Sequence, residues 1–183
     1  MSFRWVANGL VPCTNPRKRA VLGLVVLFAA GCGGGGSGQA ERLVRGSGYT
    51  FSAPVGWPVV RSGREVKASK GLPLVSVTRY PLLRAYRPEL WEHVLPELDR
   101  TAAGLAAQQQ GTVGASRTVT ISGRRARSYD IDYSRNGKQL VERLAFVLRG
   151  KTEYLLLCRY ERGGDTAACD RLGATFTLVQ RPS

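Results

Sequence analysis

The chain has 183 residues, 43% of them hydrophobic and 22% charged, which suits one domain with a buried core plus an appended segment rather than two domains. Lys and Arg outnumber Asp and Glu by 27 to 13, and Arg supplies 22 of the basic residues. With a single histidine, the chain cannot assemble a cluster of histidine ligands, and we expect neither a metal nor another cofactor.

Residues 1–31 have the pattern of an export signal. Basic residues without any acid precede an uninterrupted apolar run at 20–30, and small residues follow it. The run is 11 residues long, well short of the ~20 that a membrane-spanning helix needs. The alternative is a buried strand or helix that carries a structural cysteine.

The small residues end at Cys32, and Ala29-Ala30-Gly31-Cys32 resembles the lipobox of bacterial lipoproteins. The resemblance implies that Cys32 carries the acyl chains, such as palmitate, and that the signal is cut just before it. The partner of this segment would then be the cell membrane, with the protein lipid-anchored on its extracytoplasmic side. Two or three acyl chains, at ~0.8 kcal/mol per buried CH₂, hold a protein on a bilayer durably.

A glycine-rich segment follows the cysteine and predicts a flexible tether over residues 32–47, with the globular domain at 48–183. Gly33, Gly35 and Gly38 match the G-x-G-x-x-G fingerprint of dinucleotide-binding proteins. That fingerprint needs a preceding strand in the same sheet, and cleavage before Cys32 would remove it. We therefore predict no nucleotide site.

The first half of the domain predicts strands followed by one long helix. Alternation and β-branched residues indicate strands at 49–53, 64–69 and 74–80. Pro88 suits a first helical turn, and apolar residues then keep helical spacing on one face. Pro96 should kink or split this helix, and Gly111 is the expected C-cap.

The second half predicts antiparallel strands around an Asn136-Gly137 hairpin. A two-residue loop there would place Tyr133 opposite Leu140, Tyr129 opposite Leu144 and Asp130 opposite Arg143, the last as an ion pair. The other expected elements are strands at 118–121, 144–148, 154–160 and 175–179 and a short helix at 166–172.

This order of elements predicts an α+β domain with one curved antiparallel sheet and helices packed on it. The stretches GYTFSAPVGW, VTISGRRARSYDIDY, RLAFVLRGKTEYLLLCRY and CDRLGATFTL resemble the PsbP-like and DcrB-like bacterial lipoproteins. The resemblance implies an α/β/α sandwich and an envelope setting. The shared motifs are packing and turn residues, so the resemblance implies no catalytic residue.

Two cysteines of the globular domain, Cys158 and Cys169, remain after Cys13 and Cys32 in the N-terminal segment. In an exported domain we expect them to form a disulfide that ties the last helix to a strand. Two separate buried thiols are the alternative.

No set of residues predicts an enzyme. His93 is expected at the surface, no G-x-S-x-G elbow is present, and Trp57 and Trp91 suit a turn anchor and a core position. Asp130 and Asp132 share one face of a strand, which leaves a hydrolase with dispersed acids as an alternative.

Two arginine clusters are the most suggestive remaining feature. Arginine pairs well with phosphate and carboxylate groups, so we expect a non-catalytic binding or accessory module. Its partner would be an anionic lipid, a cell-wall polymer or another envelope protein, and not nucleic acid. A basic surface without a specific ligand is the alternative. The candidate anion-binding residues are Arg79, Arg84 and Arg87, which flank Tyr80 and Tyr86, and Arg124, Arg125 and Arg127.

Overall fold

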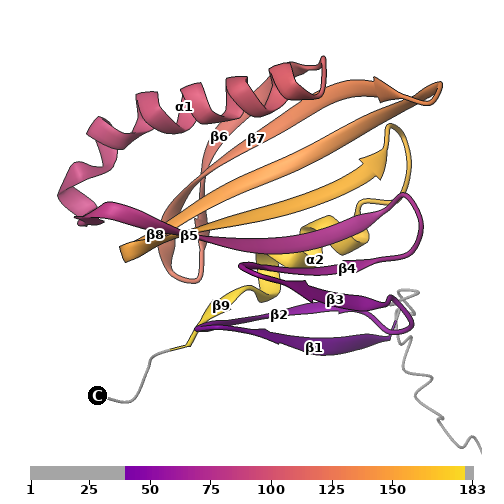
Figure 1. Cartoon of the computed structure of the whole chain (residues 1–183), viewed down its shortest axis with the longest axis horizontal. Helices are drawn as coiled ribbons and strands as arrows, with labels where there is room; N and C mark the ends of the chain where they lie inside the picture. The colour runs from indigo at the N-terminus through magenta and orange to yellow at the C-terminus, as the bar shows by residue number, and fades with distance from the viewer. Residues whose placement is uncertain (1–39, 180–183) are drawn as a thin grey trace, which may run out of the picture. The chain divides into compact units, whose positions relative to one another are not determined.

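The computed structural model describes residues 40–179, which form antiparallel sheets and two α-helices (Figure 1). The α+β class expected from the sequence is therefore confirmed. The expected signal segment, Cys32 and the glycine tract lie outside the described residues. The elements are β1 (Glu41–Gly46), β2 (Tyr49–Pro54), β3 (Val59–Ser62), β4 (Glu65–Ser69), β5 (Leu74–Tyr86), the 3₁₀ helix η1 (Pro88–Leu90), α1 (Trp91–Gln108), β6 (Thr112–Ile121), β7 (Arg124–Arg135), β8 (Lys138–Glu161), α2 (Ala167–Thr175) and β9 (Thr177–Leu178).

The larger sheet has six strands in the order β3-β4-β5-β8-β7-β6. Its central element, β8, includes both strands expected at 144–148 and 154–160 and reverses direction near Gly150, which has a φ of +53°. The reversal follows from contacts between its two ends, since Lys138 Nζ lies 2.9 Å from a Glu161 carboxylate oxygen. The first half pairs with β7 and the second half pairs with β5.

The register of the β7–β8 hairpin is the one that the Asn136-Gly137 turn predicts. Tyr133 faces Leu140, Tyr129 faces Leu144, and Asp130 faces Arg143. Both turn residues have positive φ, 51° and 74°, as a two-residue hairpin loop of this type requires. The expected ion pair is present, with Arg143 Nε 3.0 Å from an Asp130 carboxylate oxygen.

The two faces of the six-stranded sheet bury separate cores. Helix α1 packs its Leu98, Ala102 and Ala106 against one face. The other face carries α2 and a three-stranded sheet of order β1-β2-β9, where Phe51 and Leu172 are buried. Helices thus lie on opposite faces of the sheet, as the α/β/α expectation has it, and the second sheet is an addition that the sequence did not predict (Figure 1).

The folded domain begins earlier than the expected boundary at residue 48. Residues 41–46 were assigned to the tether, but they form β1 and pair along their whole length with β2. Only Val44 of β1 is fully buried, while Leu43 and Arg45 face solvent. One buried apolar residue among charged ones gives no strand pattern, which explains the difference.

Helix α1 differs from expectation at both of its special residues. Pro96 does not split it, because the lost hydrogen bond lies on the exposed side while the buried face continues beyond it. The left-handed residue after its end is Gln110, with a φ of 55°, rather than Gly111. Gly111 is needed for another reason, since a Cβ there would overlap the Asp132 carbonyl oxygen. Neither helix of the described region is long and apolar enough to cross a bilayer.

A disulfide joins Cys158 of β8 to Cys169 of α2, with their Cα atoms 5.3 Å apart, as expected. Both cysteines are buried in the core beneath the three-stranded sheet. Trp57 and Trp91 are also buried, and His93 is exposed, in line with the roles predicted for them.

Candidate functional site

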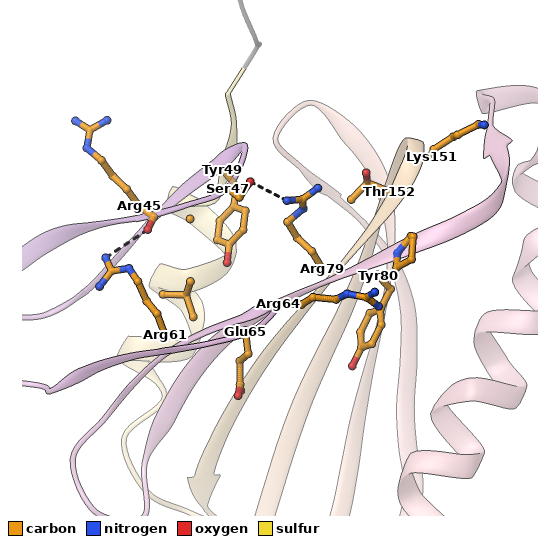
Figure 2. A pocket seen from close by; sticks show the side chains of 14 residues that line it. Arg45, Ser47, Tyr49, Arg61, Arg64, Glu65, Arg79, Tyr80, Lys151 and Thr152 are labelled. Carbon is orange, nitrogen blue, oxygen red and sulfur yellow. Dashed lines mark hydrogen bonds between the residues drawn. The ribbon is translucent and has the colours of Figure 1, made fainter.

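A cavity of about 500 Å³ opens where four turns or strand ends of the two sheets meet (Figure 2). Five of the side chains that line it are basic, and one, Glu65, is acidic. The basic residues come from separate parts of the chain: Arg45 from β1, Arg61 and Arg64 from the β3–β4 hairpin, Arg79 from β5 and Lys151 from the β8 turn.

Glycines shape the turns that carry these residues. Gly63 has a φ of +55° between Arg61 and Arg64, so the β3–β4 turn is tight and presents both arginines at one end of the hairpin. Gly46 packs so closely on the Tyr49 ring that any Cβ would overlap the ring. Tyr49 both lines the cavity and belongs to the buried core, so it separates the two.

Arg79 is the most constrained cation of the cavity. It extends from β5 toward the β1–β2 turn and donates from Nη1 to the Ser47 hydroxyl at 2.8 Å (Figure 2). Its Nε is buried and has no hydrogen-bond partner. A buried N–H without an acceptor is costly, and among the described residues Arg79 shares this feature with Arg127.

The acid of the cavity does not neutralise Arg79. Glu65 pairs with Thr78, the neighbour of Arg79, so the two side chains lie on opposite faces of the sheet. Figure 2 shows them pointing in opposite directions. Arg79 also borders a second cavity of about 310 Å³, where Arg149 donates to the Val179 carbonyl oxygen at 3.2 Å.

The other basic groups of the cavity are equally free of carboxylates. Arg61 donates to the Arg45 carbonyl oxygen at 3.4 Å. Within residues 40–179, no carboxylate lies within ion-pair distance of any of the five basic groups. The cavity therefore concentrates positive charge that the described part of the fold does not use.

Tyr49 lies next to these basic groups and is itself buried. Its hydroxyl donates to the Val77 carbonyl oxygen at 3.1 Å. Burial raises the pKa of Tyr49 to about 12, although the positive charges of Arg79 and Arg61 oppose the increase. The phenol thus stays neutral at ordinary pH and acts as a fixed wall of the cavity.

The structure separates the two arginine clusters named from the sequence. Arg79 lines the cavity, while Arg84 and Arg87 are exposed on the segment that follows it. Arg125 and Arg127 lie on the α1 side of the sheet, within 4.0 and 3.5 Å of Glu92 and Asp99. Neither of these two arginines lines the cavity, and neither does Arg124, the first residue of β7.

Four of the five basic residues of the cavity were missed by the sequence analysis: Arg45, Arg61, Arg64 and Lys151. The one available signal was the spacing of Arg61 and Arg64 beside the glycine of the tight Gly63-Arg64 turn. The convergence of four separate segments depends on the packing of two sheets, and no local pattern encodes it.

The acids considered for hydrolysis are held in ion pairs. Asp130 contacts Arg143 at 3.0 Å and Arg117 at 3.4 Å, and Asp132 contacts Arg162. Across residues 40–179, no three His, Cys, Asp or Glu side chains gather where they could hold a metal ion.

Comparisons with known proteins show the fold. No known sequence family and no curated protein matches the chain. The solution structure of a cyanobacterial PsbP (CyanoP) from Synechocystis sp. PCC 6803 matches with a TM-score of 0.52 and 18% identity, over 82% of this chain and 98% of CyanoP. The domain therefore has a PsbP-like fold.

Two further structures are similar. A protein from Bacteroides thetaiotaomicron has a TM-score of 0.56 and 11% identity over 77% of this chain, which spans about half (48%) of that protein's length. LpqN, described as involved in cell envelope biogenesis of Mycobacterium tuberculosis, has a TM-score of 0.48 and 12% identity over 77% of this chain and 91% of LpqN. At these identities the likeness concerns the fold alone.

Proposed function

We propose that this protein is a non-catalytic accessory protein of the bacterial cell envelope, anchored through Cys32, whose domain binds an oxyanion in the basic cavity. The ligand class is a phosphate or carboxylate group carried by an envelope polymer or lipid. The observation that carries the proposal is the set of five basic side chains around one cavity, none of them paired with a carboxylate of the described domain. A protein does not gain stability from such a cluster, because like charges repel one another.

The chemistry of the cavity favours an oxyanion over other ligands. A guanidinium offers several N–H donors in a plane, which matches two oxygen atoms of a phosphate or carboxylate. Arg79 has a buried donor without a partner, and Ser47 beside it adds a hydroxyl. The arginine pairs of Asp130 and Asp132 leave those acids no free role, which supports binding over hydrolysis.

Calorimetric titration of the full chain with inorganic phosphate tests the proposal. We expect saturable binding that weakens as salt is added, because the site is open to solvent. Arg79→Gln should weaken phosphate binding at least tenfold, the loss of one charge-assisted contact of about 1.5–3 kcal/mol.

Arg125→Gln is the matched control, because Arg125 carries the same charge but lies against α1 and faces Glu92. It should leave phosphate binding within about twofold of the unmodified chain. Equal losses for both substitutions would mean that phosphate binds by net charge alone, and the cavity would have no special role.

A further inference from the structure

Strand β5 leaves its register with β8 immediately after the cavity. Pro81 faces Thr152 and Tyr86 faces Gly150, so five steps along β5 accompany two steps along β8. Residues 82–85 lie between these two pairs against the single residue Lys151 of β8, so β5 has three surplus residues and forms a bulge here. Leu83 in this bulge has a relative exposure of 101%, so its side chain contacts almost nothing in the domain.

Other apolar residues are exposed on the same segment. Tyr80 and Leu90, just before and after the bulge, are 42% and 39% exposed. Single exposed apolar residues are ordinary on protein surfaces, but here three of them lie within eleven residues of chain. The bulge thus presents Leu83 as an apolar tip that the domain itself does not cover.

Three cations lie on the bulge or next to it along the two strands. Arg84 lies in the bulge, Arg87 precedes η1, and Lys151 lies on the turn of β8 that the bulge faces; all three are exposed. Glu89 is the acid of this segment, so the local charge remains positive. An apolar tip among basic side chains is the arrangement by which peripheral proteins contact the headgroup region of anionic bilayers.

The bulge is continuous with the cavity. Tyr80 and Pro81, where the bulge begins, line the cavity together with Lys151 and Thr152. A bilayer that receives Leu83 would therefore bring lipid phosphates to the cavity opening.

We propose that the Leu83 bulge, residues 82–85, docks the domain on the surface of an anionic bilayer. Leu83 enters the boundary between headgroups and acyl chains, and Arg84, Arg87 and Lys151 contact lipid phosphates. The inference rests on the proposed function, since it assigns the oxyanion of the cavity to a phospholipid headgroup.

Co-sedimentation with vesicles tests the inference, using residues 32–183 with Cys32→Ser, so that neither the apolar run at 20–30 nor an acyl chain supplies the binding. We expect binding to vesicles of mixed phosphatidylglycerol and phosphatidylcholine and little binding to phosphatidylcholine alone. Leu83→Ala should weaken binding to the anionic vesicles about tenfold, because three carbon atoms no longer leave water. Leu43→Ala, which truncates a leucine 56% exposed on β1, should leave binding unchanged.

The phosphate titration separates the two proposals. Leu83→Ala should bind inorganic phosphate like the unmodified chain, whereas Arg79→Gln should lose both phosphate and vesicle binding. Vesicle binding that is equal with and without Leu83→Ala overturns the docking inference and leaves the phosphate site standing. If the unmodified chain does not bind inorganic phosphate, the proposed function itself is overturned. A dimer of the chain that dissociates on Leu83→Ala would assign the bulge to a second copy and overturn the bilayer assignment.

Discussion

The arginines beside the helices have carboxylate partners, whereas the arginines of the cavity have none in the described domain. Arg143 lies 3.0 Å from Asp130 and 2.8 Å from Asp170, so it links β7 and β8 to α2. Arg79 and Arg64, on β5 and at the β3–β4 turn, contact no carboxylate of the described domain. The comparison teaches that arginines of one domain can have different roles. Those paired with acids hold elements of the fold together, whereas those without an acid partner are available for a ligand.

The largest effect is expected at the buried ion pair of the six-stranded sheet. Glu142 is 3% exposed and accepts hydrogen bonds from Arg159 and from the Tyr133 hydroxyl at 3.0 Å. Glu142→Ala leaves both donors without an acceptor, and the free energy of unfolding should fall by about 3–5 kcal/mol. Urea unfolding followed by circular dichroism measures this.

The control is another acid of the same strand. Glu161 pairs with Lys138 at 2.9 Å, but both side chains are half exposed. Glu161→Ala should lower stability by less than about 1 kcal/mol. If both substitutions lower the free energy of unfolding equally, burial does not make an ion pair more important for stability than exposure does.

The disulfide should come next. It closes a loop with a sequence separation of 11 residues, for which the chain-entropy model gives about 3 kcal/mol. The double substitution Cys158→Ala with Cys169→Ala should lower the free energy of unfolding by about this amount. Phosphate binding should persist in the same protein, since neither cysteine lines the cavity. A loss of phosphate binding at temperatures where the variant stays folded would contradict the separation of the two regions.

Alkaline pH provides a smaller effect at the border between cavity and core. Burial raises the pKa of Tyr49 from 10.0 to about 12. Between these two values the unfolded chain loses the phenol proton while the folded chain keeps it, so stability falls as pH rises. Tyr49→Phe should reduce this fall by roughly 1–2 kcal/mol. If the free energy of unfolding falls equally between pH 10 and 12 in the unmodified protein and in Tyr49→Phe, the buried phenol does not resist ionisation.

The smallest effect is predicted for the cavity itself. Arg64→Gln should change the free energy of unfolding by less than about 0.5 kcal/mol, because no acid of the described domain depends on Arg64. Arg143→Gln should cost about 1–2 kcal/mol, since it removes a charge-assisted bond to each of two acids. A loss above 1 kcal/mol for Arg64→Gln would show that the fold uses this residue.

Local patterns in the sequence predicted both α-helices, most strands and the β7–β8 register, but not β1, β3 or how the two sheets meet. The Asn136-Gly137 turn fixes its hairpin by itself, because a two-residue loop permits one pairing. Strand β1 was not predicted because only one of its residues is buried, which gives no alternating pattern. Its strand conformation depends on pairing with β2.

The candidate site was predictable only in part for the same reason. Arg79 was named from its place beside an aromatic residue, whereas Arg45, Arg61 and Lys151 reach the cavity through contacts between distant strands. Whether an arginine has an acid partner likewise depends on tertiary packing. Arg125 and Arg127 looked as available in the sequence as Arg79, and α1 supplies their acids.

Crystals of the protein soaked in tungstate, a strongly scattering oxyanion, test the central claim most directly. The account predicts an anomalous peak inside the cavity, within hydrogen-bond distance of the Arg79 guanidinium and close to Arg61. Peaks only at exposed arginines away from the cavity, or beside Arg125 and Arg127, would contradict it. In that case the unpaired cations would be a feature of the surface and not a binding site.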